Sequence, residues 1–423
     1  MSAADSELNR RLGLTDAVLI GTGSMIGAGV FAAFGPAARA AGSGLLIGLG
    51  VAAVIAFCNA VASAQLAAQF PASGGTYVYG RERLGEWWGF AAGWSFVIGK
   101  TASCAAMALT FAGYAVPGPG WRQRLVGIAL VLILVAANYR GVAKTAALTR
   151  LLVGATLVAL TVVVVGIWTG GDATVNHIGG WSSLAGGGLH GTLQAAGLLF
   201  FAFAGYARIA TMAEEVREPA RTIPRAIPTA LGLTMLVYLA VGVSALSAAG
   251  PGILADAGAP LTAAVQAAGS GQLAPVVRIG GALASAGALL ALIAGIGRTG
   301  LAMARQRDLP PWLAAVHPRY RVPHRAELIV GLVVCVLIAL TGLRGTIGFS
   351  SFGVLLYYAV ANLAALTQDR EHRRWPRALN VLGVLGCLAL AASLPAGAVG
   401  AGVVVVIVGL LGRFAFHRLD NRS

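Results

Sequence analysis

Long apolar runs separated by short polar segments dominate the chain. A hydrocarbon core about 30 Å thick needs roughly 20 apolar residues per helix. The runs are continuous rather than alternating, which is typical of helices and not of a transmembrane β-barrel. We therefore predict an all-α polytopic membrane protein with about twelve transmembrane helices. The expected spans are 14–40, 44–69, 87–116, 122–139, 147–169, 191–213, 226–249, 274–303, 326–342, 346–367, 376–392 and 395–416.

Composition supports this prediction. Hydrophobic residues make up 57% of the 423 residues and charged residues 11%, which is under half of the roughly 25% usual in soluble domains. The mean hydropathy of +0.80 excludes a soluble enzyme and a disordered chain. Twelve spans leave only short loops, so we expect residues 1–423 to form a single transmembrane domain.

The formal net charge of +15 follows from the distribution of Lys and Arg among the loops. If the N-terminus is cytoplasmic, the inner loops and tails carry these residues in excess by about five to one, as the positive-inside rule requires. We expect a protein of the cytoplasmic membrane with both termini inside. No basic run is interleaved with aromatic residues, so the charge does not predict a nucleic-acid partner.

Titratable side chains do not form a catalytic or metal-binding pattern. No carboxylate lies deep inside a span, and all six histidines lie in loops or at span ends. A membrane enzyme would need a nucleophile with its base, or a cluster of ligands. The cysteines have no paired spacing and are expected to be small core residues: Cys58, Cys104, Cys335 and Cys387. We predict neither an enzyme nor a metal site or cofactor.

Four glycines within nine residues interrupt the first span at Gly21, Gly23, Gly27 and Gly29. Each costs about 1 kcal/mol relative to alanine inside a helix. One interpretation is close helix packing, because Gly23 and Gly27 form a small-xxx-small pair. The other is an unwound segment lining a cavity, whose following half-helix directs free N–H groups at an anion.

The sixth span contains Gly205 within an aromatic and small-residue segment, and it would open a second five-helix repeat. Transporters with inverted repeats often break corresponding helices in the two halves. We therefore predict breaks in helices 1 and 6. The repeats would cover about residues 12–170 and 190–368, followed by two extra helices at about 375–417.

Four segments together resemble the amino acid–polyamine–organocation (APC) superfamily of permeases. Residues 21–31 resemble its glycine motif, and Pro71-Ala-Ser-Gly-Gly-Thr-Tyr-Val-Tyr79 resembles the loop after its second span. Residues 201–227 resemble its sixth-span signature, and residues 298–310 the end of its eighth span. The segments occur in the family's order from about residue 12 to 310.

This resemblance implies a five-plus-five inverted-repeat permease with a site at the two breaks. Backbone N–H groups would bind the substrate carboxylate, and backbone carbonyls would accept the α-ammonium. The implied amides are those of Gly27, Ala28 and Gly29, the implied carbonyls are those of Met25, Phe201 and Ala204, and Gly205 lies in the second break. Helix N-termini suit carboxylates and freed carbonyls suit cations, so the physical interpretation agrees.

Basic residues near the expected site are Lys100 and Arg208. Intramembrane charges usually have a function, so we assign both to coupling or selectivity, with Lys100 as the candidate carrier of a proton. The alternatives for Lys100 are a side chain that snorkels outward and one that is paired only for structure. Arg208 could instead bend toward Glu215 and leave the pocket.

Charged residues at the expected cytoplasmic ends of spans 1, 6 and 8 could form an inner gate: Asp16, Glu214, Glu215 and Arg298. The alternatives are a helix cap for Asp16, a solvated charge cluster for the two glutamates and a structural role for Arg298.

We expect a secondary transporter for small neutral or acidic amino acids, coupled to protons or to amino acid exchange. No convincing oxygen-ligand set for sodium is visible. The alternatives are a permease for polyamines or cationic amino acids, a channel, and a structural membrane protein. A polyamine site should offer carboxylates or aromatic cages, whereas the intramembrane charges here are basic.

Overall fold

The computed structural model describes residues 12–70, 74–140, 146–206, 209 and 216–420. In these residues the backbone forms helices, and its strand-like pairing is limited to one parallel bridge between Leu12 and Val216. This confirms the predicted all-helical class.

The helices follow the predicted apolar runs closely. Those of the first 170 residues are α1 (Leu14–Met25), α2 (Ala28–Ala32), α3 (Phe34–Ala41), α4 (Leu45–Gln69), α5 (Thr76–Leu84), α6 (Glu86–Ala115), α7 (Gly120–Tyr139) and α8 (Ala146–Gly170). The others are α9 (Trp181–Ala185), α10 (Gly188–Phe203), α12 (Pro219–Asp256), α13 (Pro260–Ala267), α14 (Ala274–Arg305), α15 (His324–Leu340), α16 (Leu343–Leu366), α17 (Arg377–Ser393) and α18 (Ala396–Asp420). Short 3-10 turns lie at η1 (Gly42–Gly44), η3 (Val175–His177), η5 (Gly271–Leu273) and η6 (Pro311–Ala314). The first run is thus three consecutive helices, α1 to α3, rather than one.

Nine stretches of the described chain are long and apolar enough to cross a membrane. The helices in the sixth, ninth and eleventh runs, α10, α15 and α17, have 16, 17 and 17 residues. At 1.5 Å per residue they are shorter than a hydrocarbon core of about 30 Å. The number of twelve crossings therefore stays a prediction, while the count of nine makes the chain an integral membrane protein.

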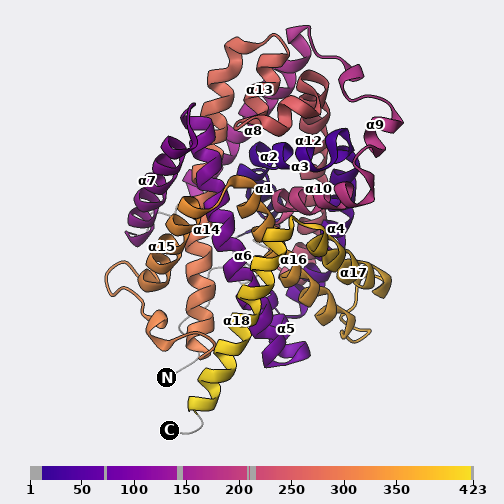
Figure 1. The fold of residues 1–423 in the computed structure, drawn as a ribbon. Coiled ribbons are helices and arrows are strands. Elements are labelled where there is room, and N and C mark those ends of the chain that lie inside the picture. Colours follow the sequence, from indigo (N-terminus) through magenta and orange to yellow (C-terminus); the bar gives the residue numbers. More distant parts are fainter. Residues whose placement is uncertain (1–11, 71–73, 141–145, 207–208, 210–215, 421–423) are drawn as a thin grey trace.

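Lipid-facing helices surround the more buried ones. Leu132 and Ile133 of α7 and Val404 of α18 are more than half exposed. In contrast, most of α6 and α16 is buried, and these helices pack against each other near the centre of the bundle (Figure 1). A β-carbon on Gly353 of α16 would lie 2.8 Å from the Cα of Gly99 in α6, so glycine permits this close crossing.

Two ends of the bundle can be distinguished. We call the end that holds α5 and the C-terminus of α18 the basal end; it lies at the bottom of Figure 1, opposite α13. The bridge between Leu12 and Val216 ties the residue before α1 to the segment before α12, and the Arg217 amide donates to the Leu12 carbonyl at 2.9 Å.

Candidate functional site: two broken helices

The first helix breaks where the glycine motif predicts. Helix α1 ends at Met25, and α2 begins at Ala28. Between them Gly27 has φ −131° and ψ −138°, which is not helical, and its amide donates to the Met25 carbonyl at 2.8 Å. The first N–H groups of α2 have no partner within their own helix. Of the three amides expected to bind a carboxylate, that of Gly27 already has a partner.

The second break lies in the sixth run. Helix α10 ends at Phe203, with Ala204 as its C-cap, and a turn continues through Tyr206. The last carbonyls of a helix lack intrahelical donors, and here they are buried, because Ala202 and Ala204 are at most 5% exposed.

Glycines bring the two breaks into direct backbone contact. A β-carbon on Gly29 would lie 2.5 Å from the Cα of Ala202. One on Gly205 would lie 2.6 Å from the Met25 amide nitrogen and closer still to the Ser24 carbonyl. Gly27 is less crowded, since its nearest neighbour would be the β-carbon of Ala288 in α14, at 3.3 Å. Gly29 and Gly205 are thus required by the approach of one break to the other.

Lys100 reaches the second break from α6. Its side chain is buried and donates from Nζ to the Ala204 carbonyl at 3.1 Å. The side chain therefore points into the protein and does not snorkel. One carbonyl that the resemblance assigns to the substrate ammonium is thus bound by an ammonium of the protein itself.

Tyr238 of α12 was not predicted, and it joins the two breaks. Its hydroxyl lies 2.6 Å from the Met25 carbonyl and 2.9 Å from the Ala202 carbonyl, and the residue is 1% exposed. Its ring packs edge-on against Phe203, with centroids 5.1 Å apart. A single tyrosine in an apolar run gives no sequence signal for this contact.

Five predicted coupling and gate residues remain: Asp16, Arg208, Glu214, Glu215 and Arg298. Arg208, Glu214 and Glu215 lie outside the described residues. The carboxylate of Asp16 accepts the Gly13 amide at 3.2 Å, which is the helix-capping alternative. Arg298 is exposed on α14. The inner gate expected from Asp16, Glu214, Glu215 and Arg298 stays a prediction.

A buried charge cluster at the basal end was also not predicted. The Asp308 carboxylate, with a fully buried side chain, accepts from Arg413 Nε at 2.8 Å, the Tyr77 hydroxyl at 2.6 Å and Arg81 at 3.3 Å. Glu86 pairs with Arg81 at 2.6 Å and with Arg413 at 3.6 Å. We call these five residues the Asp308 cluster. It attaches α18 to α5, to the start of α6 and to the segment after α14.

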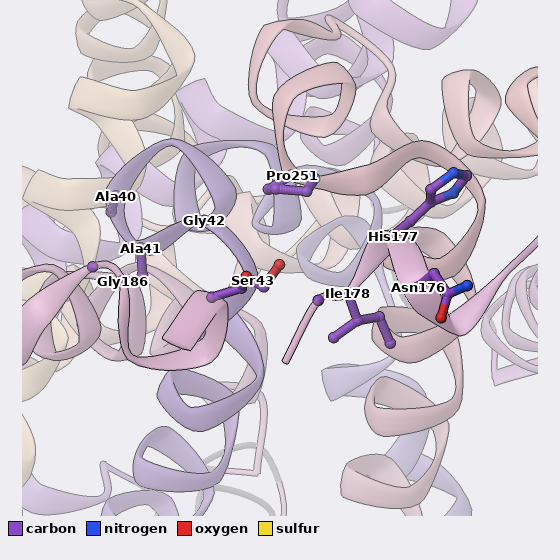
Figure 2. A pocket seen from close by; sticks show the side chains of 12 residues that line it. Ala40, Ala41, Gly42, Ser43, Asn176, His177, Ile178, Gly186 and Pro251 are labelled. Atoms are coloured by element: carbon purple, nitrogen blue, oxygen red, sulfur yellow. The ribbon is translucent and has the colours of Figure 1, made fainter. Parts of the chain in front are cut away.

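A separate cavity of about 490 Å³ lies between η1, the segment around η3 and α12. Figure 2 shows Ser43, Asn176, His177 and Pro251 among its lining residues. The His177 ring nitrogen Nδ1 lies 2.8 Å from the Ser247 carbonyl. None of the residues at the two breaks lines this cavity.

Comparison with known proteins supports the motif resemblance. The sequence profile described as amino acid permease matches residues 12–413. The chain is 59% identical to an uncharacterized transporter of Mycobacterium tuberculosis over 96% of this chain and 90% of that protein. It is 26% identical to a branched-chain amino acid permease of Bacillus subtilis over 89% and 84% of the two chains. It is 28% identical to cationic amino acid transporter 4 of Homo sapiens over 84% and 59%.

The profile match covers nearly the whole chain, including both broken helices, and the relatives named are all transporters. The resemblance to the APC superfamily and the prediction that the protein is not an enzyme are therefore confirmed. The chain belongs to the amino acid permease family.

Proposed function

We propose that the protein is a secondary transporter of small neutral or acidic amino acids in the cytoplasmic membrane, working by alternating access. The two breaks bind the substrate: the first amides of α2 receive its carboxylate, and backbone carbonyls at the breaks accept hydrogens from its ammonium. The proposal also includes twelve membrane crossings, a five-plus-five inverted repeat, and a cytoplasmic basal end with both termini inside.

The position of Lys100 is the observation that carries the proposed selectivity and coupling. Its ammonium donates to Ala204 at the second break, where the backbone of the two broken helices meets. At an effective dielectric constant of 20, like charges 4 Å apart repel by about 4 kcal/mol, or roughly a thousandfold in affinity. A cationic tail close to Lys100 is therefore disfavoured. Proton release from Lys100 would remove this charge and weaken its bond to Ala204, which couples protonation to the geometry of the break.

Uptake into proteoliposomes tests this function. We expect labelled alanine, leucine or glutamate to enter, and a pH gradient or internal amino acid to stimulate entry. Replacing sodium by choline at a constant pH gradient should leave the rate unchanged. Uptake that collapses in choline would contradict the proposed coupling.

A cationic substrate is the alternative, because the relatives include a cationic amino acid transporter. Competition separates the two substrate classes. We expect unlabelled alanine to inhibit uptake of labelled substrate more strongly than unlabelled lysine or arginine does. Preferential uptake of lysine or arginine would show that Lys100 does not face the substrate tail.

We predict that Lys100→Met loses stimulation by a pH gradient and becomes at least about tenfold more sensitive to inhibition by lysine. The substitution keeps an unbranched apolar side chain but removes the charge and the donor to Ala204. Thr101→Val is the matched control, because Thr101 is also buried in α6 and its hydroxyl donates to the Val97 carbonyl of the same helix. Unchanged pH stimulation in a well-folded Lys100→Met protein would remove Lys100 from the coupling mechanism.

A further inference from the structure

Three buried oxygen atoms meet between the broken helices. They are the carbonyl oxygens of Met25 and Ala202 and the hydroxyl oxygen of Tyr238, which lies 2.6 Å and 2.9 Å from the two carbonyls. Each of the three residues is at most 5% exposed. Buried polar groups need hydrogen-bond partners, so these oxygens need enough N–H or O–H donors nearby.

The hydroxyl alone cannot satisfy both carbonyls at once. A tyrosine hydroxyl has one hydrogen and two lone pairs. When the hydrogen points to one carbonyl, a lone pair of Tyr238 faces the other. The Met25 carbonyl also accepts a hydrogen bond from the Gly27 amide, at 2.8 Å. Ala202 lies in the last turn of α10, where carbonyls lack helical partners. The three oxygens together accept more hydrogens than Tyr238 supplies.

We infer that Tyr238 is a specificity-determining residue that completes the binding position for the substrate ammonium, an inference that rests on the proposed function. Tyr238 gives its hydrogen to the Met25 carbonyl. The ammonium donates one hydrogen to the Ala202 carbonyl and another to the Tyr238 oxygen. An ammonium suits this group better than a hard metal ion, which prefers six or more oxygen ligands.

The distribution of charge favours this position over the one that the family resemblance implies. The Ala204 carbonyl, two residues farther along, is bound by the positively charged Lys100. An arriving ammonium is repelled there. On the other side the Tyr238 hydroxyl is neutral, and it supplies one hydrogen to the two carbonyls that it contacts. The substrate is thereby oriented with its ammonium toward α12 and away from α6.

Tyr238→Phe removes the hydroxyl while keeping the ring that packs on Phe203. The measurement is ligand-induced thermal stabilisation of the purified protein by L-alanine against propionate and by L-leucine against 4-methylpentanoate. Each acid has its partner's side chain and carboxylate but no amino group. We expect the preference for the amino acid over its acid to fall by roughly tenfold, because a charged hydrogen bond is lost. Binding of the two acids should change little.

Tyr357→Phe is the matched control, because Tyr357 is also buried and its hydroxyl accepts the Thr76 amide at 3.0 Å, away from the two breaks. It should retain the wild-type preference. A second measurement needs no variant: N,N,N-trimethylalanine keeps the charge but has no N–H group, so it should bind wild-type protein at least tenfold more weakly than alanine.

An unchanged preference in Tyr238→Phe, or equal losses for amino acid and acid, would overturn this inference alone. Alanine-like binding of the trimethyl analogue would do the same. If the wild-type protein is stabilised by no amino acid, the proposed function fails and this inference fails with it.

Discussion

Replacing Gly205 by alanine is expected to reduce uptake by roughly a hundredfold, because the new methyl group would collide with backbone rather than with a movable side chain. Its β-carbon would lie 2.6 Å from the Met25 amide nitrogen and closer still to the Ser24 carbonyl. Both atoms belong to the other broken helix. The collision would separate the two breaks, and with them the amides and carbonyls that are proposed to bind substrate. Uptake into proteoliposomes containing equal amounts of inserted protein measures the loss.

Alanine substitutions at other glycines should reduce uptake according to how crowded the added β-carbon would be. Gly29→Ala should be as damaging, since its β-carbon would lie 2.5 Å from the Ala202 Cα. Gly27→Ala should cost much less, because it meets only the β-carbon of Ala288 at 3.3 Å. Gly232→Ala in α12 is the control and should transport normally, as its added carbon has no neighbour within 4 Å. Normal uptake by the Gly205→Ala protein would mean that the breaks do not need to touch.

The positions of the breaks could be predicted from the sequence because their cause is local. Four glycines in nine residues are costly in a helix, and Gly205 stands at the corresponding place in a later run. The same local reasoning correctly placed the helices on the apolar runs. It did not establish how many runs cross the membrane, because α10, α15 and α17 are each shorter than 18 residues.

The partners of the break residues could not be predicted, because they come from distant parts of the chain. Tyr238 and Met25 are 213 residues apart in sequence, and Lys100 and Ala204 are 104 apart. Lys100 was recognised because a charge in an apolar run is unusual. Tyr238 was missed because a tyrosine in such a run is ordinary. The contacts depend on packing that apolar periodicity alone does not specify.

The contact between Asp308 and Arg413 at the basal end could not be predicted either, because the two residues are 105 residues apart in sequence. Asp308 follows one apolar run and Arg413 lies near the end of another, and neither position indicates a partner. The structure instead buries both side chains, with 0% and 2% exposure. Arg413 also lies over the ring of Trp87, 4.5 Å from its centroid. Burying a charge is tolerated only when partners and hydrogen bonds are supplied, so each member of the pair depends on the other.

Asp308→Ala is therefore expected to destabilise the protein by about 3–5 kcal/mol, because it leaves the buried Arg413 guanidinium without its main partner. The Tyr77 hydroxyl loses its acceptor in the same substitution. Because Arg413 is the residue through which α18 joins the cluster, this helix should detach first. Thermal unfolding of the detergent-purified protein measures the overall loss, and limited proteolysis within α18 measures the detachment.

The double variant Asp308→Ala/Arg413→Met separates an unpaired charge from a simple packing loss. Removing both charges takes away the uncompensated guanidinium, so part of the lost stability should return. Glu86→Gln is the control for a partly solvated member of the cluster. The Glu86 side chain is 61% exposed, so this change should cost no more than about 1 kcal/mol. If the double variant is no more stable than Asp308→Ala, the defect lies in packing around Asp308 and not in the isolated charge. If Asp308→Ala unfolds at the wild-type temperature, the Asp308 cluster does not hold α18 in place.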